Sequence, residues 1–105
     1  MAIYRGYRYQ EAGELVVTKD GQPLSPVPSQ KLFNYSPDGF RWGYGGSGPA
    51  QLALALLLDV TNDPGLSFRL HQTFKRHFVA AWGEKWQICS DDIETWIAER
   101  KYYRT

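Results

Sequence analysis

The sequence predicts an α+β fold: a small antiparallel β-sheet from the first half of the chain, packed against three α-helices from the second half. Two patterns support this prediction. Extended segments separated by turn signals continue to about Tyr44, and helical periodicity begins after Gly48. The chain has 105 residues, of which 43% are hydrophobic, which is enough for a single core. We therefore expect one domain over residues 1–105.

The first strands follow from local patterns. Ile3 to Tyr9 alternates between two faces, and Leu15 to Thr18 is rich in β-branched residues. Asp20-Gly21 is a hairpin turn signal. The prolines that follow prevent a regular ladder, so any returning strand should be short and lie at an edge. Those prolines are Pro23, Pro26 and Pro28.

Extended structure is expected to resume at Leu32 to Tyr35. Ser36 to Gly39 reads SPDG, in which proline fixes φ at the second turn position and glycine frees the fourth. Phe40, Trp42 and Tyr44 then alternate with small or charged residues, which predicts a strand with an aromatic face.

The second half of the chain predicts helices. Pro49 suits a first helical position, and the segment to about Val60 is apolar nearly all round, so this helix should be the buried centre of the fold. Asn62 to Gly65 ends it, and an amphipathic helix is expected from about Ser67 to Trp82.

The last part of the chain predicts a third helix. Gly83 is expected to act as a C-cap, Trp86 to Ile88 as a short extended link, and Ser90 as the N-cap of the last helix. Asp91 and Asp92 complement the dipole of that helix, and its buried edge is formed by Ile93, Trp96 and Ile97.

Composition excludes several classes of function. A formal net charge of +1 requires no polyanionic partner, and the single cysteine, Cys89, excludes an internal disulfide. The N-terminus lacks an apolar signal core, and the longest apolar run, Leu52 to Leu58, is far shorter than a bilayer span. We expect a cytoplasmic protein.

Catalytic and metal-binding patterns are weak. His71 and His77 are six residues apart, so they cannot form the i, i+4 pair of a helical metal site. Cys89 lies near a helix N-terminus but has no identified base. Asp91, Asp92 and Glu94 are explained as charges of a first helical turn. The sequence therefore predicts no catalytic residue, no metal and no cofactor.

The glycine loop, residues 43–48, has three interpretations. It matches G-x-G-x-x-G, but a second helix follows where a dinucleotide-binding unit needs a strand. It could hold an anion on the amides of Gly45 to Gly48, with the Ser47 hydroxyl and Arg41 nearby. The favoured interpretation is a tight strand-to-helix connection against the Trp42 and Tyr44 rings, and positive φ is expected at Gly46 and Gly48 if they form the tight turn.

Aromatic and cationic residues alternate near both ends of the chain, as they do in surfaces that bind nucleic acids. These residues are Arg5, Tyr7 and Arg8, and Arg100, Lys101 and Arg104. They form one surface only if the fold brings the termini together. The alternative, which we favour, is an edge strand protected by charge and a basic tail.

Residues 36–57, SPDGFRWGYGGSGPAQLALALL, resemble the signature of a domain-of-unknown-function family of short bacterial, phage and plasmid proteins. Tyr4 to Tyr7, Phe74-Lys75 and Trp86 to Trp96 are also similar to its pattern. The resemblance implies no activity, cofactor or catalytic residue. It implies an origin in a mobile element, and therefore an accessory role.

We therefore expect a non-enzymatic accessory protein that binds another macromolecule, most readily a host protein or a protein encoded by the same element. The expected binding residues lie in and next to the glycine loop: Arg41, Trp42, Tyr44, Gly45, Gly46, Ser47, Gly48 and Gln51. The alternative is a module that binds nucleic acid or a phosphate-containing ligand through this loop and the Arg/Tyr-rich ends. Oligomeric state is not predicted.

Overall fold

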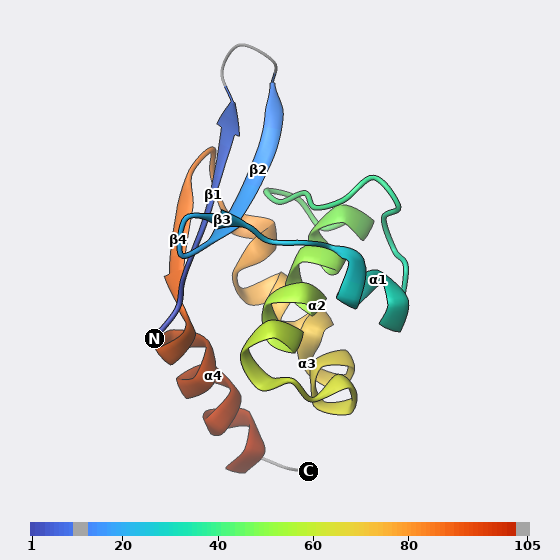
Figure 1. Cartoon of the computed structure of the whole chain (residues 1–105). Coiled ribbons are helices and arrows are strands. Elements are labelled where there is room, and N and C mark those ends of the chain that lie inside the picture. The colour runs from blue at the N-terminus through green and yellow to red at the C-terminus, as the bar shows by residue number, and fades with distance from the viewer. Residues whose placement is uncertain (10–12, 103–105) are drawn as a thin grey trace.

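The computed structural model describes residues 1–9 and 13–102, with the side chains described to residue 100. A four-stranded antiparallel sheet lies beside a group of helices, as the sequence predicts (Figure 1). The elements are β1 (Ile3–Tyr9), β2 (Glu14–Lys19), β3 (Gln22–Pro23), α1 (Val27–Leu32), α2 (Ser47–Thr61), α3 (Pro64–His77), a 3-10 turn η1 (Val79–Ala81), β4 (Trp86–Cys89) and α4 (Ser90–Tyr102). In this part of the chain no helix is long and apolar enough to cross a membrane.

The sheet has the order β3-β2-β1-β4. The β2–β3 turn is the predicted Asp20-Gly21 hairpin, with φ of 51° and 83°, and β3 is a two-residue edge strand as expected. Two expectations were wrong. β1 is a central strand, because Trp86 to Cys89 is not a link but a strand that pairs with it. Arg5 therefore lies between two strands, whereas Arg8 lies past the last β1–β4 pair, where β1 is paired with β2 alone.

The segment between the sheet and α2 differs from the prediction. Residues 27–32 form α1, so Leu32 ends a helix where a strand was expected. Pro26 has helical φ and ψ of −77° and −12°, which starts α1 rather than a ladder. Residues 40–44 form no strand, because Gly43 has φ of 85° and donates its N–H to the carbonyl of Val79.

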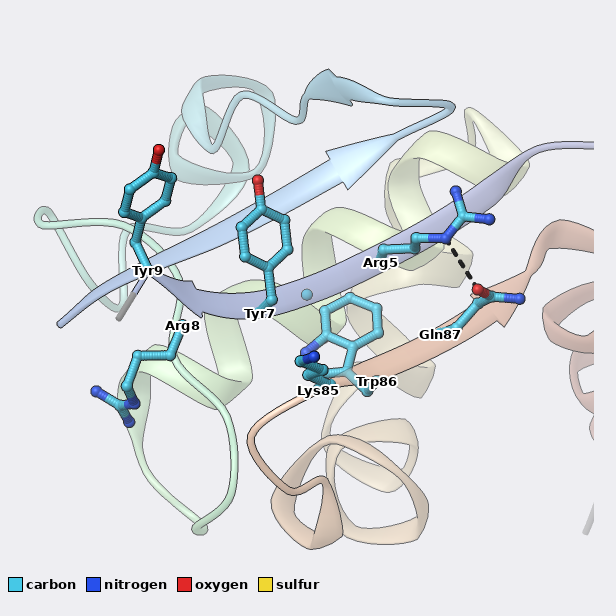
Figure 2. A pocket seen from close by; sticks show the side chains of 8 residues that line it. Arg5, Tyr7, Arg8, Tyr9, Lys85, Trp86 and Gln87 are labelled. Atoms are coloured by element: carbon cyan, nitrogen blue, oxygen red, sulfur yellow. Dashed lines mark hydrogen bonds between the residues drawn. The ribbon is translucent and has the colours of Figure 1, made fainter. Parts of the chain in front are cut away.

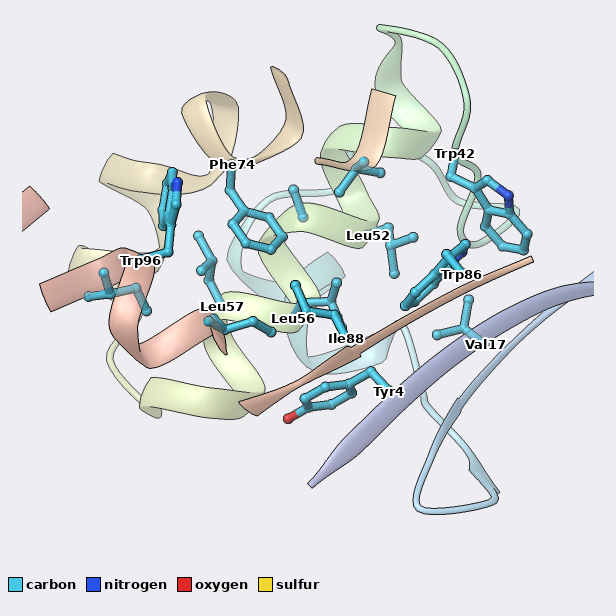
Figure 3. Packing of buried hydrophobic residues seen from close by; sticks show 14 of the residues in the cluster. Tyr4, Val17, Trp42, Leu52, Leu56, Leu57, Phe74, Trp86, Ile88 and Trp96 are labelled. Atoms are coloured by element: carbon cyan, nitrogen blue, oxygen red, sulfur yellow. The ribbon is translucent and has the colours of Figure 1, made fainter. Parts of the chain in front are cut away.

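Helix α2 is the centre of the fold, as predicted. Leu52, Leu54, Leu56 and Leu57 are fully buried. Leu52, Leu56 and Leu57 pack in one cluster with aromatic side chains from the sheet and the other helices (Figure 3). The helix begins at Ser47, so Pro49 is its third residue rather than its first.

The other helix boundaries depend on specific caps. Helix α3 begins at Pro64, earlier than predicted, because the Asp63 carboxylate accepts a hydrogen bond from the Leu66 amide at 3.1 Å. It ends at His77, so Gly83 is not its C-cap. Ser90 is the first residue of α4, and its hydroxyl accepts from the Ala2 amide at 2.9 Å instead of capping α4.

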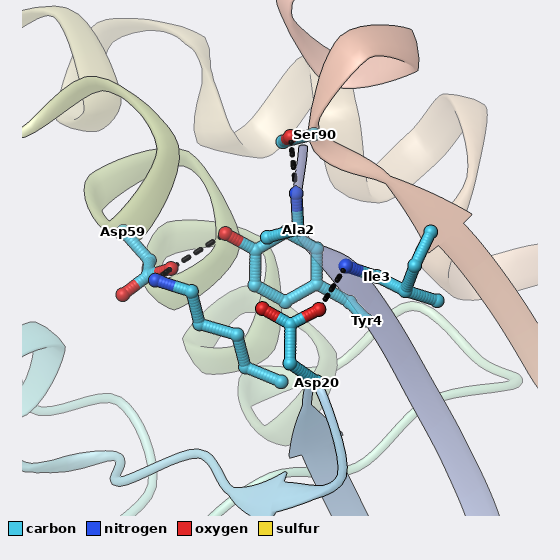
Figure 4. A network of polar contacts seen from close by, with 7 residues as sticks. Ala2, Ile3, Tyr4, Asp20, Asp59 and Ser90 are labelled. Carbon is cyan, nitrogen blue, oxygen red and sulfur yellow. Dashed lines mark hydrogen bonds and ion pairs between the residues drawn. The ribbon is translucent and has the colours of Figure 1, made fainter.

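Polar contacts anchor β1 to the helices (Figure 4). The buried Tyr4 hydroxyl donates to the Asp59 carboxylate of α2 at 2.5 Å, and Lys19 forms an ion pair with the same carboxylate at 2.8 Å. Burial and the neighbouring carboxylate raise the pKa of Tyr4 well above its ordinary value. These contacts fix the position of β1 relative to the core.

Candidate functional site

The glycine loop is shaped by close packing rather than by positive φ. Gly46 is extended, with φ of −135°, and Gly48 lies within α2, so the expected positive φ at these two positions was wrong. A Cβ on Gly46 would lie 2.5 Å from the Tyr44 ring, and one on Gly48 would lie 2.4 Å from the Arg41 side chain. Both positions therefore need glycine for space.

The predicted loop residues divide into two groups. Trp42 and Gly48 are buried, and the Trp42 indole N–H donates to the Gly83 carbonyl at 2.7 Å. Gln51 is also fully buried. The loop side chains that remain exposed for a ligand or a partner are Arg41, Tyr44 and Ser47, together with the backbone of Gly45.

The Gln51 side chain holds the chain segment before the loop. Its amide oxygen accepts from the backbone N–H groups of Tyr35 and Ser36, at 2.7 and 3.0 Å. Its amide nitrogen donates to the Ser29 hydroxyl and the Phe33 carbonyl, at 3.0 and 3.1 Å. These four hydrogen bonds hold residues of the fold together, which is a structural role. The sequence analysis predicts Gln51 as a binding residue instead.

The histidines and the cysteine are engaged within the fold. His71 is 1% exposed; its Nδ1–H donates to the Phe68 carbonyl and its Nε2 accepts from the Tyr35 hydroxyl at 2.8 Å. His77 Nδ1 accepts from Trp96, and the Cys89 thiol donates to Asp92 at 3.1 Å. Across residues 1–9 and 13–100 no group of three His, Cys, Asp or Glu side chains could hold a metal.

Acid should destabilise the protein through His71. Burial lowers its pKa below 6.5, so the folded state binds its proton less readily than the unfolded chain does. Above pH 6.5, His71 should therefore not reduce the free energy of unfolding. Below that value, the free energy of unfolding should fall as the pH decreases. Urea unfolding between pH 7.5 and 5 measures this loss. In His71→Gln the decline should be smaller, and an equal decline in both proteins would contradict the assignment.

A groove lies where β1 continues past β4. The last β1–β4 pair is Gly6 with Trp86, whereas β1 stays paired with β2 as far as Tyr9. The step leaves a groove of about 560 Å³, which we call the β1–β4 groove (Figure 2). Its lining is Arg5, Gly6, Tyr7, Arg8, Tyr9, Lys85, Trp86 and Gln87.

The groove is cationic and aromatic. Arg5 donates through Nε to the Gln87 amide oxygen at 2.9 Å, and Arg8 donates to the Gly13 carbonyl at 3.2 Å. Lys85 is exposed at the groove. No carboxylate is among the described lining residues, so three positive charges gather here in a chain whose net charge is only +1.

Trp86 of the groove lining packs against two further tryptophans. The Trp86 ring stacks on Trp82 with 4.0 Å between centroids and meets Trp42 edge-on at 5.7 Å. Gly6 lies directly against the Trp86 indole, where a Cβ would be 2.1 Å from Nε1. The glycine loop thus contributes to the groove indirectly, because its Trp42 supports Trp86.

The described residues of the two predicted Arg/Tyr-rich ends do not meet. Arg5, Tyr7 and Arg8 lie at the groove, whereas α4 leads away from the sheet (Figure 1). Arg100 packs 4.0 Å over the Trp96 ring and donates to the Trp96 carbonyl at 3.1 Å. Lys101 is in α4, and Arg104 lies outside the described residues.

Sequence reasoning missed Lys85, Trp86 and Gln87, which complete the groove. The missed signal was the alternation of Trp86 and Ile88, buried, with Gln87, exposed, which is typical of a strand. The three residues Trp86 to Ile88 were instead interpreted as a short extended link before the last helix.

The fold and the groove define a small α+β domain with a cationic, aromatic surface beside its sheet. The chain belongs to the family of unknown function DUF6166, which it matches over residues 4–99. No curated protein and no solved structure matches it.

Proposed function

We propose that this protein is a non-enzymatic binding protein and that its ligand is a single-stranded nucleic acid, held in the β1–β4 groove. The observation that carries the proposal is the lining of that groove. Three cations, Arg5, Arg8 and Lys85, lie beside two tyrosines, and no carboxylate is among the described lining residues. A mobile-element origin and a cytoplasmic location, suggested by the resemblance of the signature and by the lone cysteine, belong to the same proposal.

Tyr7 and Tyr9 supply two surfaces for stacking. They are two residues apart on one strand, so they project from the same face, about 7 Å apart (Figure 2). Tyr9 is 55% exposed. Unpaired bases stack on such rings whatever their sequence, while flanking cations neutralise the phosphates. This arrangement suits a single strand better than a duplex, whose bases are already stacked.

Binding should therefore fall steeply with salt. Three phosphate contacts predict a slope of log K against log salt of about −2 for a single strand. Lys85→Ala should reduce that slope by about 0.7. Tyr7→Ala should weaken binding by about 1–3 kcal/mol with an unchanged slope, because it removes stacking and no charge. Fluorescence anisotropy with a labelled 12-nucleotide single strand between 50 and 200 mM salt measures both effects.

Arg69→Ala is the matched control, because Arg69 is an exposed cation on α3 and does not line the groove. It changes the net charge as Lys85→Ala does and should leave the slope unchanged. An equal effect of the two variants would show that binding follows net charge alone. Failure of the wild-type protein to bind at 50 mM salt would end the proposal.

A protein partner is the second candidate, and one observation favours it. Tyr44 of the glycine loop is 51% exposed, although its ring is large and largely apolar. A partner held by apolar contacts should survive a high-salt wash in a pull-down and be lost in Tyr44→Ser. Nucleic acid recovered alone and released by salt would favour the groove instead.

A further inference from the structure

Trp86 carries an unpaired hydrogen-bond donor. Among the described residues, its Nε1 is the one buried side-chain nitrogen or oxygen without a hydrogen-bond partner. The indole N–H groups of Trp42 and Trp96 are bonded, to the Gly83 carbonyl at 2.7 Å and to His77 at 3.2 Å. Buried donors are paired in the great majority of native structures, so this exception requires an explanation.

The unpaired donor lies at the groove. Trp86 is only 7% exposed, yet it is among the groove-lining residues, and Nε1 lies at the indole edge next to Gly6 (Figure 2). Trp82 stacks on its ring. Trp42 meets it edge-on (Figure 3), so the indole is held in place. The donor therefore has a fixed position, buried next to the groove in which the proposed function places the ligand.

The surroundings of Nε1 select the chemistry of its partner. Trp86 Nε1 lies against Gly6 in an indole that packs on two other tryptophan rings, and moving a charged phosphate into such surroundings costs its hydration. The cations Arg5, Arg8 and Lys85 meet phosphates at the exposed side of the groove. A neutral oxygen suits the buried donor better. Thymine, cytosine and guanine carry such a carbonyl oxygen, and adenine carries none.

We propose that the Trp86 indole N–H donates a hydrogen bond to a base carbonyl oxygen of the bound strand, and that it makes the groove discriminate against adenine. This inference rests on the proposed function. Because Nε1 is buried, a base reaches it only by displacing part of the groove lining, in which Arg8 and Lys85 are exposed. One neutral hydrogen bond corresponds to a discrimination of about two- to tenfold.

Two measurements test the proposal on the intact chain. In a ¹⁵N–¹H correlation spectrum, the Trp86 indole resonance is identified by its loss in Trp86→Phe. Addition of a 12-nucleotide oligothymidine should shift it downfield by forming a hydrogen bond, while the resonances of Trp42 and Trp96, already bonded, should stay in place. Binding of oligothymidine and oligoadenine of equal length is then compared by anisotropy for the wild type and Trp86→Phe.

The outcome that supports the proposal is a two- to tenfold loss of the preference for oligothymidine in Trp86→Phe. Oligoadenine also binds less well because its bases stack on one another. The test is therefore the difference in preference between the wild type and Trp86→Phe, and not the preference of the wild type alone. An unmoved Trp86 resonance in a protein saturated with oligothymidine overturns the inference and leaves the proposed function intact. Absence of binding to either oligonucleotide at 50 mM salt overturns both. If Trp86→Phe does not fold, Trp42→Phe, Trp82→Phe and Trp96→Phe identify the other three indole resonances, and the remaining resonance of the wild-type protein decides.

Discussion

Gly6→Ala should strongly destabilise the protein. The new Cβ would lie 2.1 Å from Nε1 and 2.2 Å from Cε2 of Trp86. The indole cannot retreat, because Trp82 stacks on its ring and Trp42 meets its edge. Relief must come from moving β1 or the tryptophans, at a cost of about 3 kcal/mol, the upper part of the range for overpacking.

Thermal unfolding measures the effect, and a loss of about 3 kcal/mol corresponds to a fall in Tm of roughly 15 °C. Gly45→Ala is the matched control, since no atom lies within 4 Å of its Cβ and its φ is not positive. Both variants replace glycine by alanine, so they reduce the conformational entropy of the unfolded chain equally and this effect cancels in the comparison. We expect the control to stay within about 0.5 kcal/mol of the wild type. Equal stability of the two variants would contradict the packing of Trp86 against Gly6.

Gln51→Leu should destabilise the protein by an amount on the order of 3 kcal/mol. Leucine is similar in size but leaves the Tyr35 and Ser36 amides without their acceptor and the Phe33 carbonyl without its donor. Unpaired buried groups of this kind cost about 1–3 kcal/mol each. The total loss of stability is smaller than the sum for three groups, because the segment can open locally and let water bond to them. Urea unfolding measures the loss of stability.

Hydrogen exchange gives the same prediction a local readout. The amides of Tyr35 and Ser36 should exchange much faster in Gln51→Leu, because both donate to the side chain that is removed. Gln22→Leu is the control, since Gln22 is exposed on β3. Unchanged protection of Tyr35 and Ser36 in Gln51→Leu would show that Gln51 does not hold this segment.

The candidate site could be predicted only in part. Arg5, Tyr7 and Arg8 were recognisable because cations and aromatics alternate along one short segment. Their partners on β4 are about 80 residues away, and nothing local indicates which strand pairs with β1. The loop residues Trp42 and Gln51 were interpreted as binding residues, because the sequence does not tell a side chain that faces the core from one that faces a ligand.

Sequence patterns alone predicted the α+β class, the first two strands, the Asp20-Gly21 turn with a short edge strand after it, and the buried helix α2. Each follows from local properties, such as alternation, positive φ and a fully apolar helix surface. Only the tertiary structure decided that β4 joins β1, that Trp86 lies against Gly6 and that the β1–β4 groove forms. These features depend on contacts between distant residues, whose free energy comes from packing and burial that local propensity does not record.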